Sequence, residues 1–280
     1  MEITKQLIKD KLPRRPLKGN KGTFGSALII AGSKNYPGAA ILSCLACARV
    51  GAGLVTLASD ETVYKVAVTK IPFATFLDFS EIVNTLDKYD SVLIGPGLGK
   101  NKDLRLMINE WIKLEELANK ELVLDADCLN IISEIKDWFE IFKTDAVFTP
   151  HPGEISRLTG LSIEEIQNNR QEIAKKFSKT WNKTIVLKGA ETVIANPEGE
   201  VFVSPFKNPL LATAGTGDVL AGIIVGLLAQ GLNLTSAATC GVYLHGMAGE
   251  KLRERFGDRG ATALDLVEVL PEVFKALKAS

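Results

Sequence analysis

Six short runs of nearly continuous apolar residues, separated by segments of helical length, constrain the fold of this chain more than any other feature. The runs are Ala27–Ala31, Leu54–Ala58, Val92–Ile94, Leu122–Leu124, Ala146–Thr149 and Thr184–Leu187. Continuous apolar runs suit strands that are covered on both faces, as in a parallel sheet beneath helices. The alternation of strands and helices therefore predicts an α/β fold with a mostly parallel central sheet and helices on both faces.

The rest of the sequence supplies helices and a hairpin. Helical spacing extends over Lys102–Ala118, Ser162–Trp181, Thr216–Gln230, Leu234–Phe256 and Thr262–Lys278. Ser162 and Glu165 have the spacing of a capping box, and Pro271 is expected to kink or divide the last helix. Thr192–Ala195 and Val201–Ser204 flank a polar turn and predict an antiparallel hairpin at the sheet edge. Because no linker, repeat or low-complexity tract is visible, residues 1–280 are expected to form a single domain.

Composition excludes some classes of function. Lys plus Arg and Asp plus Glu number 33 each, so no excess of positive charge favours nucleic acid or an anionic membrane. The amino terminus has no apolar signal segment, and the run Val219–Ala229 is too short to span a bilayer. Four cysteines in 280 residues are typical of a reduced cytoplasmic protein. We interpret Cys44 and Cys47, spaced C-x-x-C, as part of a packed helix face rather than a metal or redox site.

Several predicted strands end in glycine, proline or charged residues. These segments are Gly95-Pro96-Gly97-Leu98-Gly99, Asp125-Ala126-Asp127, Pro150-His151-Pro152-Gly153-Glu154 and Lys188-Gly189. The carboxyl ends of parallel strands meet at one edge of the sheet, and ligands of open α/β sheets bind there. We therefore expect these segments to line one crevice.

The strongest local signal is Ala214-Gly215-Thr216-Gly217-Asp218 at the start of a predicted apolar helix. An apolar face is expected from Leu220, Ile223, Ile224, Leu227 and Leu228. A helix start offers unpaired N–H groups to a phosphate, and glycines let the phosphate approach the backbone. An acid in this turn also complements the helix dipole, worth about 0.3–1 kcal/mol. The two glycines favour a functional role for Asp218 beyond that.

Standard nucleotide-binding motifs are absent from the sequence. It contains no G-x-x-x-x-G-K-[ST] motif, and no G-x-G-x-x-G opens the first βα unit. A P-loop or a Rossmann dinucleotide site is therefore not supported. The segment 18–25 is basic and glycine-rich, and it either contacts phosphate or leads into the first strand.

The chain resembles the ribokinase-like superfamily, whose anion hole has the form G-[AT]-G-D, and more closely the ADP-dependent NAD(P)H-hydrate dehydratases in their stand-alone form, without an epimerase domain. The matching segments, in family order, are Lys18–Gly25, Pro37–Ala40, Gly95–Gly99, Leu124–Asn130, Thr149–Glu154, Lys188–Thr192 and Ala214–Asp218. The most specific pair is Thr149–Glu154 with Gly215–Asp218. Cys128 stands where alanine is usual in the family.

The resemblance implies a role for each matched residue. Asp218 would be the catalytic base and would also contact the substrate. The hydrated nicotinamide nucleotide would be bound by Ala39, Ala40, Gly97, Gly99 and His151. The adenine nucleotide would be held by Lys188, Gly189, Ala190, Glu191, Thr192, Gly215, Thr216 and Gly217. Asp125, Asp127 and Asn130 fit a structural and a functional role equally well, and His245 is interpreted as structural.

The implied reaction is the ADP-dependent dehydration of the S-epimer of hydrated NADH or NADPH, which gives NAD(P)H, AMP and phosphate. Asp218 would accept the hydroxyl proton while the oxygen attacks the β-phosphorus of ADP. Mg²⁺ would neutralise the diphosphate; its ligands are not identifiable, and Glu154 is a candidate. The resemblance also implies a homo-oligomer, with a tetramer as one possibility, and a separate NAD(P)H-hydrate epimerase acting alongside.

Two other functions remain open. One is a superfamily kinase that uses ATP to phosphorylate a vitamin precursor or sugar; the histidine of Thr149–Glu154 argues against it. The other is a catalytically silent nucleotide-binding protein, and Asp218 argues against that, because a pure binder needs the glycine turn but not the base.

Overall fold

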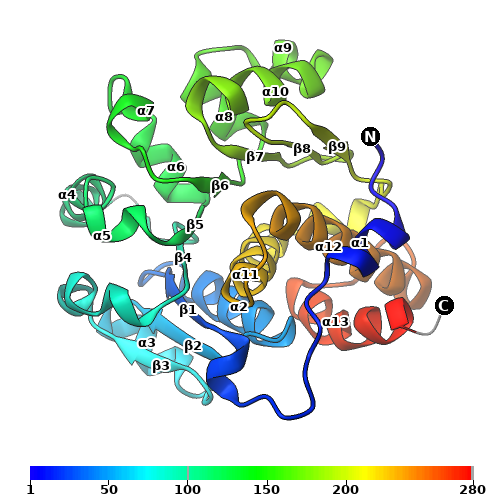
Figure 1. Cartoon of the computed structure of the whole chain (residues 1–280), viewed down its shortest axis with the longest axis horizontal. Coiled ribbons are helices and arrows are strands. Elements are labelled where there is room, and N and C mark those ends of the chain that lie inside the picture. The colour runs from blue at the N-terminus through cyan, green and yellow to red at the C-terminus, as the bar shows by residue number, and fades with distance from the viewer. Residues whose placement is uncertain (100, 279–280) are drawn as a thin grey trace.

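The computed structural model describes residues 1–99 and 101–278. Within them, one sheet has nine strands in the order β3-β2-β1-β4-β5-β6-β7-β8-β9 (Figure 1). The strands are β1 (Ser26–Ile30), β2 (Leu54–Ala58), β3 (Thr75–Leu77), β4 (Ser91–Ile94), β5 (Glu121–Leu124), β6 (Ala146–Phe148), β7 (Thr184–Leu187), β8 (Val193–Ala195) and β9 (Val201–Val203). Strands β1 to β7 pair in parallel and β8 and β9 form an antiparallel hairpin, which confirms the predicted sheet and hairpin. The sequence analysis missed β3.

Helices cover both faces of this sheet (Figure 1). One face carries α1 (Lys5–Lys11), α2 (Pro37–Arg49), α3 (Glu61–Ala67), α11 (Thr216–Ala229), α12 (Leu234–Phe256) and α13 (Ala263–Lys278). The other carries α4 (Lys102–Trp111), α5 (Glu115–Ala118), α6 (Ala126–Ile132), α7 (Trp138–Ile141), α8 (Pro152–Thr159), α9 (Ile163–Asn168) and α10 (Arg170–Trp181). Alternate residues of β1 separate the two cores, because Ala27 and Ile29 face the first group while Leu28 and Ile30 face the second.

Three helix predictions need correction. The predicted helix 102–118 is α4 followed by the short α5, since Leu114 is extended and lets the chain bury Leu117. The predicted helix 162–181 is α9 and α10, divided at Asn169, whose side chain donates to the Glu165 carbonyl. The cap at Ser162 is confirmed by its bond from the Glu165 N–H. Pro271 lies inside α13 without dividing it.

Helix α11 is the central helix of the molecule. The prediction of a single apolar face was too narrow, because every residue from Val219 to Ala229 is buried. Two of its glycines allow close packing on α2: a Cβ atom on Gly222 would lie 2.4 Å from the Ser43 carbonyl oxygen, and one on Gly226 would lie 2.8 Å from the Cys47 carbonyl oxygen. The first turn of α11 is therefore held in place by a tightly packed core.

The direction of chain crossover reverses between β1 and β4, since the chain runs from β1 out to β3 and then returns to β4 on the other side. Ligands of open α/β sheets bind at such a point, beyond the carboxyl ends of the strands.

Gly25 lies at the opposite edge, where a Cβ atom would lie 1.7 Å from the carbonyl oxygen of Ala229 at the far end of α11. The segment 18–25, which contains the 3₁₀ helix η1 (Lys21–Phe24), is thus a lead-in to β1 and does not reach Asp218.

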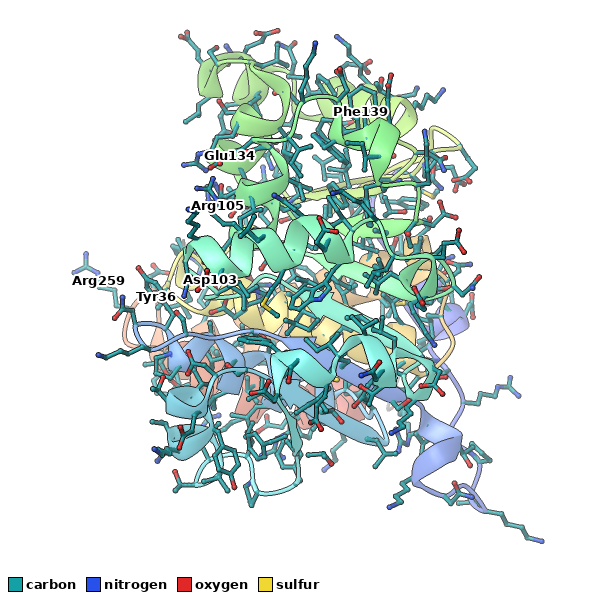
Figure 2. The ribbon with its side chains drawn as sticks, turned by 90° about the vertical axis from the view of Figure 1, so that its left-hand side faces the viewer. Tyr36, Asp103, Arg105, Glu134, Phe139 and Arg259 are labelled. Atoms are coloured by element: carbon teal, nitrogen blue, oxygen red, sulfur yellow. The ribbon has the colours of Figure 1, made fainter. Side chains whose placement is uncertain are left out.

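The outer surface shows how α4 and α6 are joined. Arg105 on α4 forms an ion pair with Glu134, just after α6 (Figure 2). Both side chains are exposed, so the pair adds little to stability. Figure 2 also shows Tyr36, which precedes α2, and Arg259, which precedes α13, on one side of the molecule. Within the described residues, no helix combines the length and apolar character needed to cross a membrane.

Candidate active site

The first turn of α11 is built as an open helix tip. Gly215 is the N-cap residue with a φ of 90° and makes no side-chain cap. A side chain here would be strained by that φ and would also meet Leu42, whose Cδ1 lies 2.6 Å from the Cβ position. Within residues 1–99 and 101–278, the N–H groups of Gly217 and Asp218 have no hydrogen-bond acceptor. The tip therefore offers unpaired donors to an anion.

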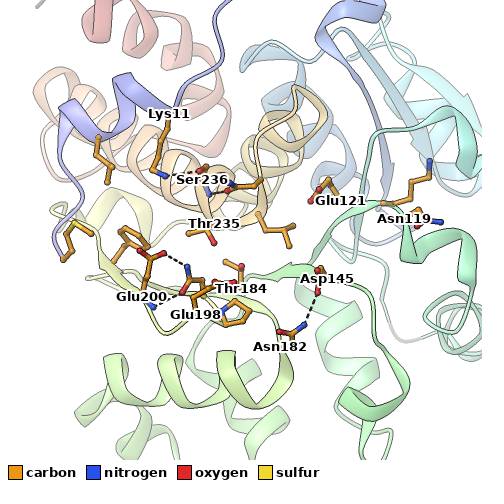
Figure 3. Close-up of a pocket in the computed structure, with 18 of the residues that line it drawn as sticks. Lys11, Asn119, Glu121, Asp145, Asn182, Thr184, Glu198, Glu200, Thr235 and Ser236 are labelled. Atoms are coloured by element: carbon orange, nitrogen blue, oxygen red, sulfur yellow. Dashed lines mark hydrogen bonds between the residues drawn. The ribbon is translucent and has the colours of Figure 1, made fainter.

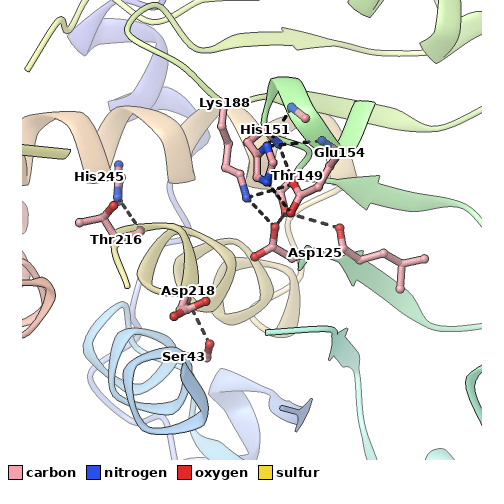
Figure 4. A network of polar contacts seen from close by, with 11 residues as sticks. Ser43, Asp125, Thr149, His151, Glu154, Lys188, Thr216, Asp218 and His245 are labelled. Atoms are coloured by element: carbon pink, nitrogen blue, oxygen red, sulfur yellow. Dashed lines mark hydrogen bonds and ion pairs between the residues drawn. The ribbon is translucent and has the colours of Figure 1, made fainter. Parts of the chain in front are cut away.

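Asp218 stands in this first turn, partly buried. Burial, together with the nearby charge of Asp125, raises its pKa to about 7, although Lys188 opposes the shift. A carboxyl group with a pKa close to neutral pH is suited to accept and release a proton. The Ser43 hydroxyl donates to the Asp218 carbonyl oxygen at 3.2 Å and ties the turn to α2 (Figure 4).

A polar network lies above this turn, at the ends of β5, β6 and β7 (Figure 4). Lys188 Nζ donates to Asp125 Oδ1 at 2.7 Å and lies 3.8 Å from Glu154 Oε2. Thr149 Oγ1 donates to the same Asp125 oxygen at 2.7 Å. Burial works against the charge of Lys188, but Asp125 and Glu154 more than offset it and raise the pKa of Lys188. The lysine therefore stays protonated at neutral pH.

His151 is held by a capping box at the start of α8. Its Nδ1 accepts from the N–H groups of Gly153 and Glu154, at 2.9 and 3.4 Å. In the neutral ring the proton must then be on Nε2, which lies 3.2 Å from Glu154 Oε1. Burial and the charges of Lys188 and Arg157 lower the pKa of His151, which keeps the ring neutral. The side chain is 50% exposed, so its outer edge is available to a ligand.

Glu154 is less accessible than the sequence suggested. Its Oε2 accepts from the His151 N–H at 2.7 Å, its Oε1 faces the His151 ring, and its side chain is 4% exposed. Burial raises its pKa to about 7. Since both oxygens serve His151, the position of Glu154 does not support the prediction that it binds a metal.

A cavity of about 620 Å³ opens beside the α11 tip. Its wall includes seven of the predicted site residues, namely His151, Lys188, Gly189, Ala190, Thr192, Thr216 and Gly217. The opposite wall comes from the segment between β9 and α11 and from α12, through Phe206, Leu211, Val242 and His245. Six of the eight predicted nucleotide residues thus share one cavity with His151, whereas Glu191 and Gly215 are not part of its wall. Asp218 directly follows Gly217 in the chain.

The loop after β7 is held by a residue that the sequence analysis missed. Arg170, at the start of α10, donates through Nη2 to the carbonyl oxygens of Leu187 and Glu191, at 2.8 and 3.2 Å. Gly189 permits this approach, because a Cβ atom there would lie 2.7 Å from Arg170 Nη2. The Glu191 side chain is itself exposed and pairs with Lys207 at 2.7 Å. No motif links Arg170 to this loop, because the contact depends on tertiary packing.

The predicted substrate residues other than His151 and Asp218 form a second group, near β1 and β4. A Cβ atom on Gly97 would lie 2.7 Å from the Ala39 Cβ, so these two residues are in contact. Gly99 donates its N–H to Asp127 Oδ2 at 2.7 Å. Ala40 is fully buried and lies against Gly32. Of the two alanines proposed to contact substrate, only Ala39 therefore offers surface to a ligand.

Two further predicted residues have clear structural contacts. Asn130 Oδ1 accepts from Arg157 at 2.9 Å, which joins α6 to α8. His245 Nε2 lies 2.9 Å from the Thr216 carbonyl oxygen; because a carbonyl only accepts, this nitrogen is the donor. The bond ties α12 to the α11 tip, in agreement with a structural role, but His245 also lines the cavity. Burial lowers the pKa of His245 to about 4.

Comparison with known proteins identifies the family. A profile described as NAD(P)H-hydrate dehydratase matches residues 27–272. The chain belongs to this family. It is 33% identical to the ADP-dependent (S)-NAD(P)H-hydrate dehydratase of Bacillus subtilis, over 97% of each chain. It is 37% identical to a bifunctional NAD(P)H-hydrate repair enzyme of Moorella thermoacetica, over 99% of this chain and 54% of that protein. The chain thus spans about half the length of the bifunctional relatives.

Solved structures of this family have the same fold. The Bacillus subtilis ADP/ATP-dependent NAD(P)H-hydrate dehydratase, co-crystallised with ATP and Mg²⁺, has a TM-score of 0.88 and 33% identity, over 99% of this chain and 98% of that one. A ribokinase-like superfamily protein of Enterococcus faecalis has a TM-score of 0.83 and 32% identity, over 99% and 95%. The ribokinase-like fold predicted for this dehydratase family member is therefore confirmed.

Proposed function

We propose that the chain dehydrates the S-epimer of hydrated NADH or NADPH to NAD(P)H, with ADP as phosphoryl donor and AMP and phosphate as by-products. The observation that carries this proposal is the position of Asp218, a partly buried carboxyl group with a pKa of about 7 in the turn that leaves the Gly217 N–H unpaired. The family name and the full-length relative supply the substrate class. A carboxyl base beside an anion-binding helix tip is the arrangement that phosphoryl transfer to a hydroxyl group needs.

In this mechanism Asp218 accepts the proton of the substrate hydroxyl group. At the same time the hydroxyl oxygen bonds to the β-phosphorus of ADP, and AMP leaves. A positioned base of this kind contributes roughly 10²–10⁴-fold to the rate. The N–H groups at the α11 tip hold the transferred phosphoryl group and offset its charge. Phosphate then leaves the ring carbon as the lone pair of the ring nitrogen forms a C=N bond, and loss of a proton from the neighbouring ring carbon to water gives the C=C double bond of NAD(P)H.

We place the adenine nucleotide in the cavity lined by the loop after β7. This loop is fixed by Arg170, and the cavity has room for a base and ribose between the loop and α12. We place the substrate on the side of Ala39, Gly97 and Gly99. The Asp218 turn contacts α2, the helix that carries Ala39, through Ser43, and its Gly217 approaches Lys188 of the nucleotide loop. We therefore propose that the β-phosphorus and the hydroxyl group meet at this turn.

Mg²⁺ fits this site as an ion carried by the nucleotide. Among the described residues, no group of three or more His, Cys, Asp or Glu side chains is placed to hold a metal alone. Mg²⁺ is usually held by one or two carboxylates together with substrate phosphates. Asp127 is partly buried, and within residues 1–99 and 101–278 its one hydrogen bond is at Oδ2, which accepts from Gly99. Its other oxygen is the one we assign to the ion. When bound, Mg²⁺ would neutralise the diphosphate.

The test is incubation of the purified chain with hydrated NADH and Mg²⁺ plus either ADP or ATP. We expect the absorbance of reduced nicotinamide to return together with stoichiometric AMP when ADP is supplied. Consumption of ATP with a vitamin precursor or sugar, and no action on hydrated NADH, would assign the chain to a superfamily kinase instead. Tight binding of ADP without turnover of any of these compounds would identify a silent binding protein.

The partners and the location follow from the same proposal. Bifunctional relatives combine two activities in one chain, so we propose that this dehydratase works alongside an NAD(P)H-hydrate epimerase that supplies the S-epimer. A homo-oligomer and a cytoplasmic location remain predictions. Light scattering and cell fractionation test them directly.

A further inference from the structure

Lys188 joins the ends of the strands to the α11 tip. On one side its Nζ lies 2.7 Å from Asp125 Oδ1 and 3.8 Å from Glu154 Oε2. On the other side, a Cβ atom placed on Gly217 would lie 3.6 Å from the same nitrogen. The ammonium group therefore reaches the turn where the transferred phosphoryl group would bind, next to Asp218 (Figure 4).

The lysine is only partly used by its protein partners. Its side chain is 18% exposed, whereas Asp125 is 1% exposed, and Lys188 lines the cavity assigned to the nucleotide. An ammonium group has three N–H donors. One bonds to Asp125, and Glu154 is too distant for a second full hydrogen bond. A lysine that served only the core would not keep donors free toward a cavity.

The position of Lys188 is set by buried groups on three adjacent strands. Asp125 follows β5, Thr149 follows β6 and Lys188 follows β7. Asp125 Oδ1 accepts from both the lysine and the threonine hydroxyl, each at 2.7 Å. The Lys188 N–H also donates to the Pro150 carbonyl oxygen at 2.9 Å. The ammonium group is thus fixed before a ligand arrives, which is the condition for effective electrostatic stabilisation of a transition state.

We propose that Lys188 is a catalytic residue that stabilises the negative charge of the phosphoryl group during its transfer from ADP, and that Asp125 is its positioning residue. This inference rests on the proposed dehydratase function and adds a participant to it. The bond from AMP to the phosphorus breaks, the bond from the substrate oxygen forms, and the proton passes to Asp218. Lys188 keeps all its protons and forms no covalent bond.

The proposal predicts a coupling between Lys188 and the titration of Asp218. The lysine charge lowers the pKa of Asp218 against the effects of burial and of Asp125. Loss of that charge would raise the pKa of Asp218 further and move the acid limb of the rate profile to higher pH. This shift follows from the proximity of the two charges alone, so kcat of the variants is compared at a pH above the acid limb, where Asp218 is ionised in each of them.

The experiment measures dehydratase turnover and its pH profile for the full chain with hydrated NADH, ADP and Mg²⁺. We expect Lys188→Met to lower kcat by about 10²-fold or more, the loss typical of a removed electrostatic donor, and to change KM for ADP much less. Lys188→Arg keeps the charge and should retain part of kcat. Asp125→Asn should lower kcat by a smaller factor.

A double variant separates positioning from an independent effect. If Asp125 acts through Lys188, then Asp125→Asn together with Lys188→Met should be no slower than Lys188→Met alone. This variant also removes both partners of the buried pair, so neither charge is left uncompensated and folding is protected. If the kcat losses of the two single variants multiply in the double variant, the positioning role of Asp125 is overturned.

Lys183 provides a matched control. It is a buried lysine beside the other end of β7, where its Nζ donates to the carbonyl oxygens of Trp181 and Asn182. Lys183→Met should keep the kcat of the native chain. Lys188→Met with kcat within about threefold of the native chain, or with a change confined to KM for ADP, would overturn the catalytic role. A native chain without dehydratase activity would instead overturn the proposed function on which the role of Lys188 depends.

Discussion

Two cavities of similar size lie beyond the two ends of the parallel strands, here called the carboxyl edge and the amino edge of the sheet. They differ in whether the backbone N–H groups at the adjacent helix start are paired. The cavity at the carboxyl edge has about 620 Å³, and one at the amino edge, beside the start of α12, has about 780 Å³ (Figure 3). Both are lined by charged side chains and the start of a long helix. Size and polarity alone therefore do not distinguish the site from the other cavity.

The N-termini of α12 and α11, which lie beside these two cavities, differ in their capping. At the amino edge, Asn233 Oδ1 accepts from the Ser236 N–H at 2.8 Å, and Lys11 Nζ donates to the Ser236 hydroxyl at 3.0 Å. At the carboxyl edge, Gly215 provides no cap, and the N–H groups of Gly217 and Asp218 have no acceptor in the part of the chain that the structure describes. A capped helix start is satisfied by the protein, whereas an open one leaves its N–H groups to water or to a ligand. The comparison points to the Gly215 end as the reactive one.

The largest effect should come from Asp218→Asn. The amide cannot accept the hydroxyl proton, so we expect kcat to fall by about 10²–10⁴-fold while the chain remains folded. Turnover is read from the return of reduced nicotinamide absorbance, and folding from circular dichroism. Near-native turnover in this variant would remove the functional distinction between the two edges.

The pH dependence of the native chain gives the next largest effect. Because burial raises the pKa of Asp218 to about 7, kcat should fall about tenfold for each pH unit below that value and level off above it. The raised pKa also means that the folded chain binds a proton near pH 4–7 that the unfolded chain has lost. This contribution to stability is complete below about pH 4 and disappears as pH rises through 7.

Asp218→Asn should therefore gain stability relative to the native chain as the pH rises through 7, and thermal unfolding at pH 5 and pH 8 measures the change. Glu154 titrates in the same range, so Glu154→Gln is the matched control for the rate profile. An acid limb that persists unchanged in Asp218→Asn would assign the titration to another group.

The smallest effects are expected from substitutions at the two helix starts, which should differ in their effect on the free energy of unfolding and on ADP affinity. Gly215→Ala places a methyl group at a φ of 90° and against Leu42, so we expect a loss of about 1–3 kcal/mol and weaker ADP binding. Asn233→Ala removes only a cap and should cost about 1 kcal/mol with ADP affinity unchanged. Denaturant unfolding and calorimetric titration with ADP provide the two readouts, and weaker ADP binding by Asn233→Ala would contradict the comparison.

Much of the fold could be predicted because its signals are local. The strands Leu54–Ala58 and Thr184–Leu187 have the predicted bounds, since continuous apolar runs need cover on both faces. Strand β3 was missed because Thr75–Leu77 is short and lies half exposed at the sheet edge. The break at Asn169 was missed because neither glycine nor proline marks it.

The site was predictable only in part for the same reason. Asp218 ends the motif Gly215–Asp218 and Lys188 begins the segment Lys188–Thr192, and the structure brings Lys188 to the turn that holds Asp218. The role of Asp125 stayed undecided because its partner Lys188 is 63 residues away, and only the strand order brings the two together. Arg170 had no signal, because its contact with the loop after β7 depends on the packing of α10.

The glycine contacts between α2 and α11 have a consequence for how this protein can change. Gly222 and Gly226 hold the reacting turn against the interior, whereas the cavity wall from Ser204 to Ala212 belongs to the connection between β9 and α11, whose regular structure is one short 3₁₀ helix. Mutations that alter which molecule is accepted can accumulate in that stretch while the reaction centre keeps its geometry. Proteins that share this fold can therefore change the molecule they accept while they keep the same reaction.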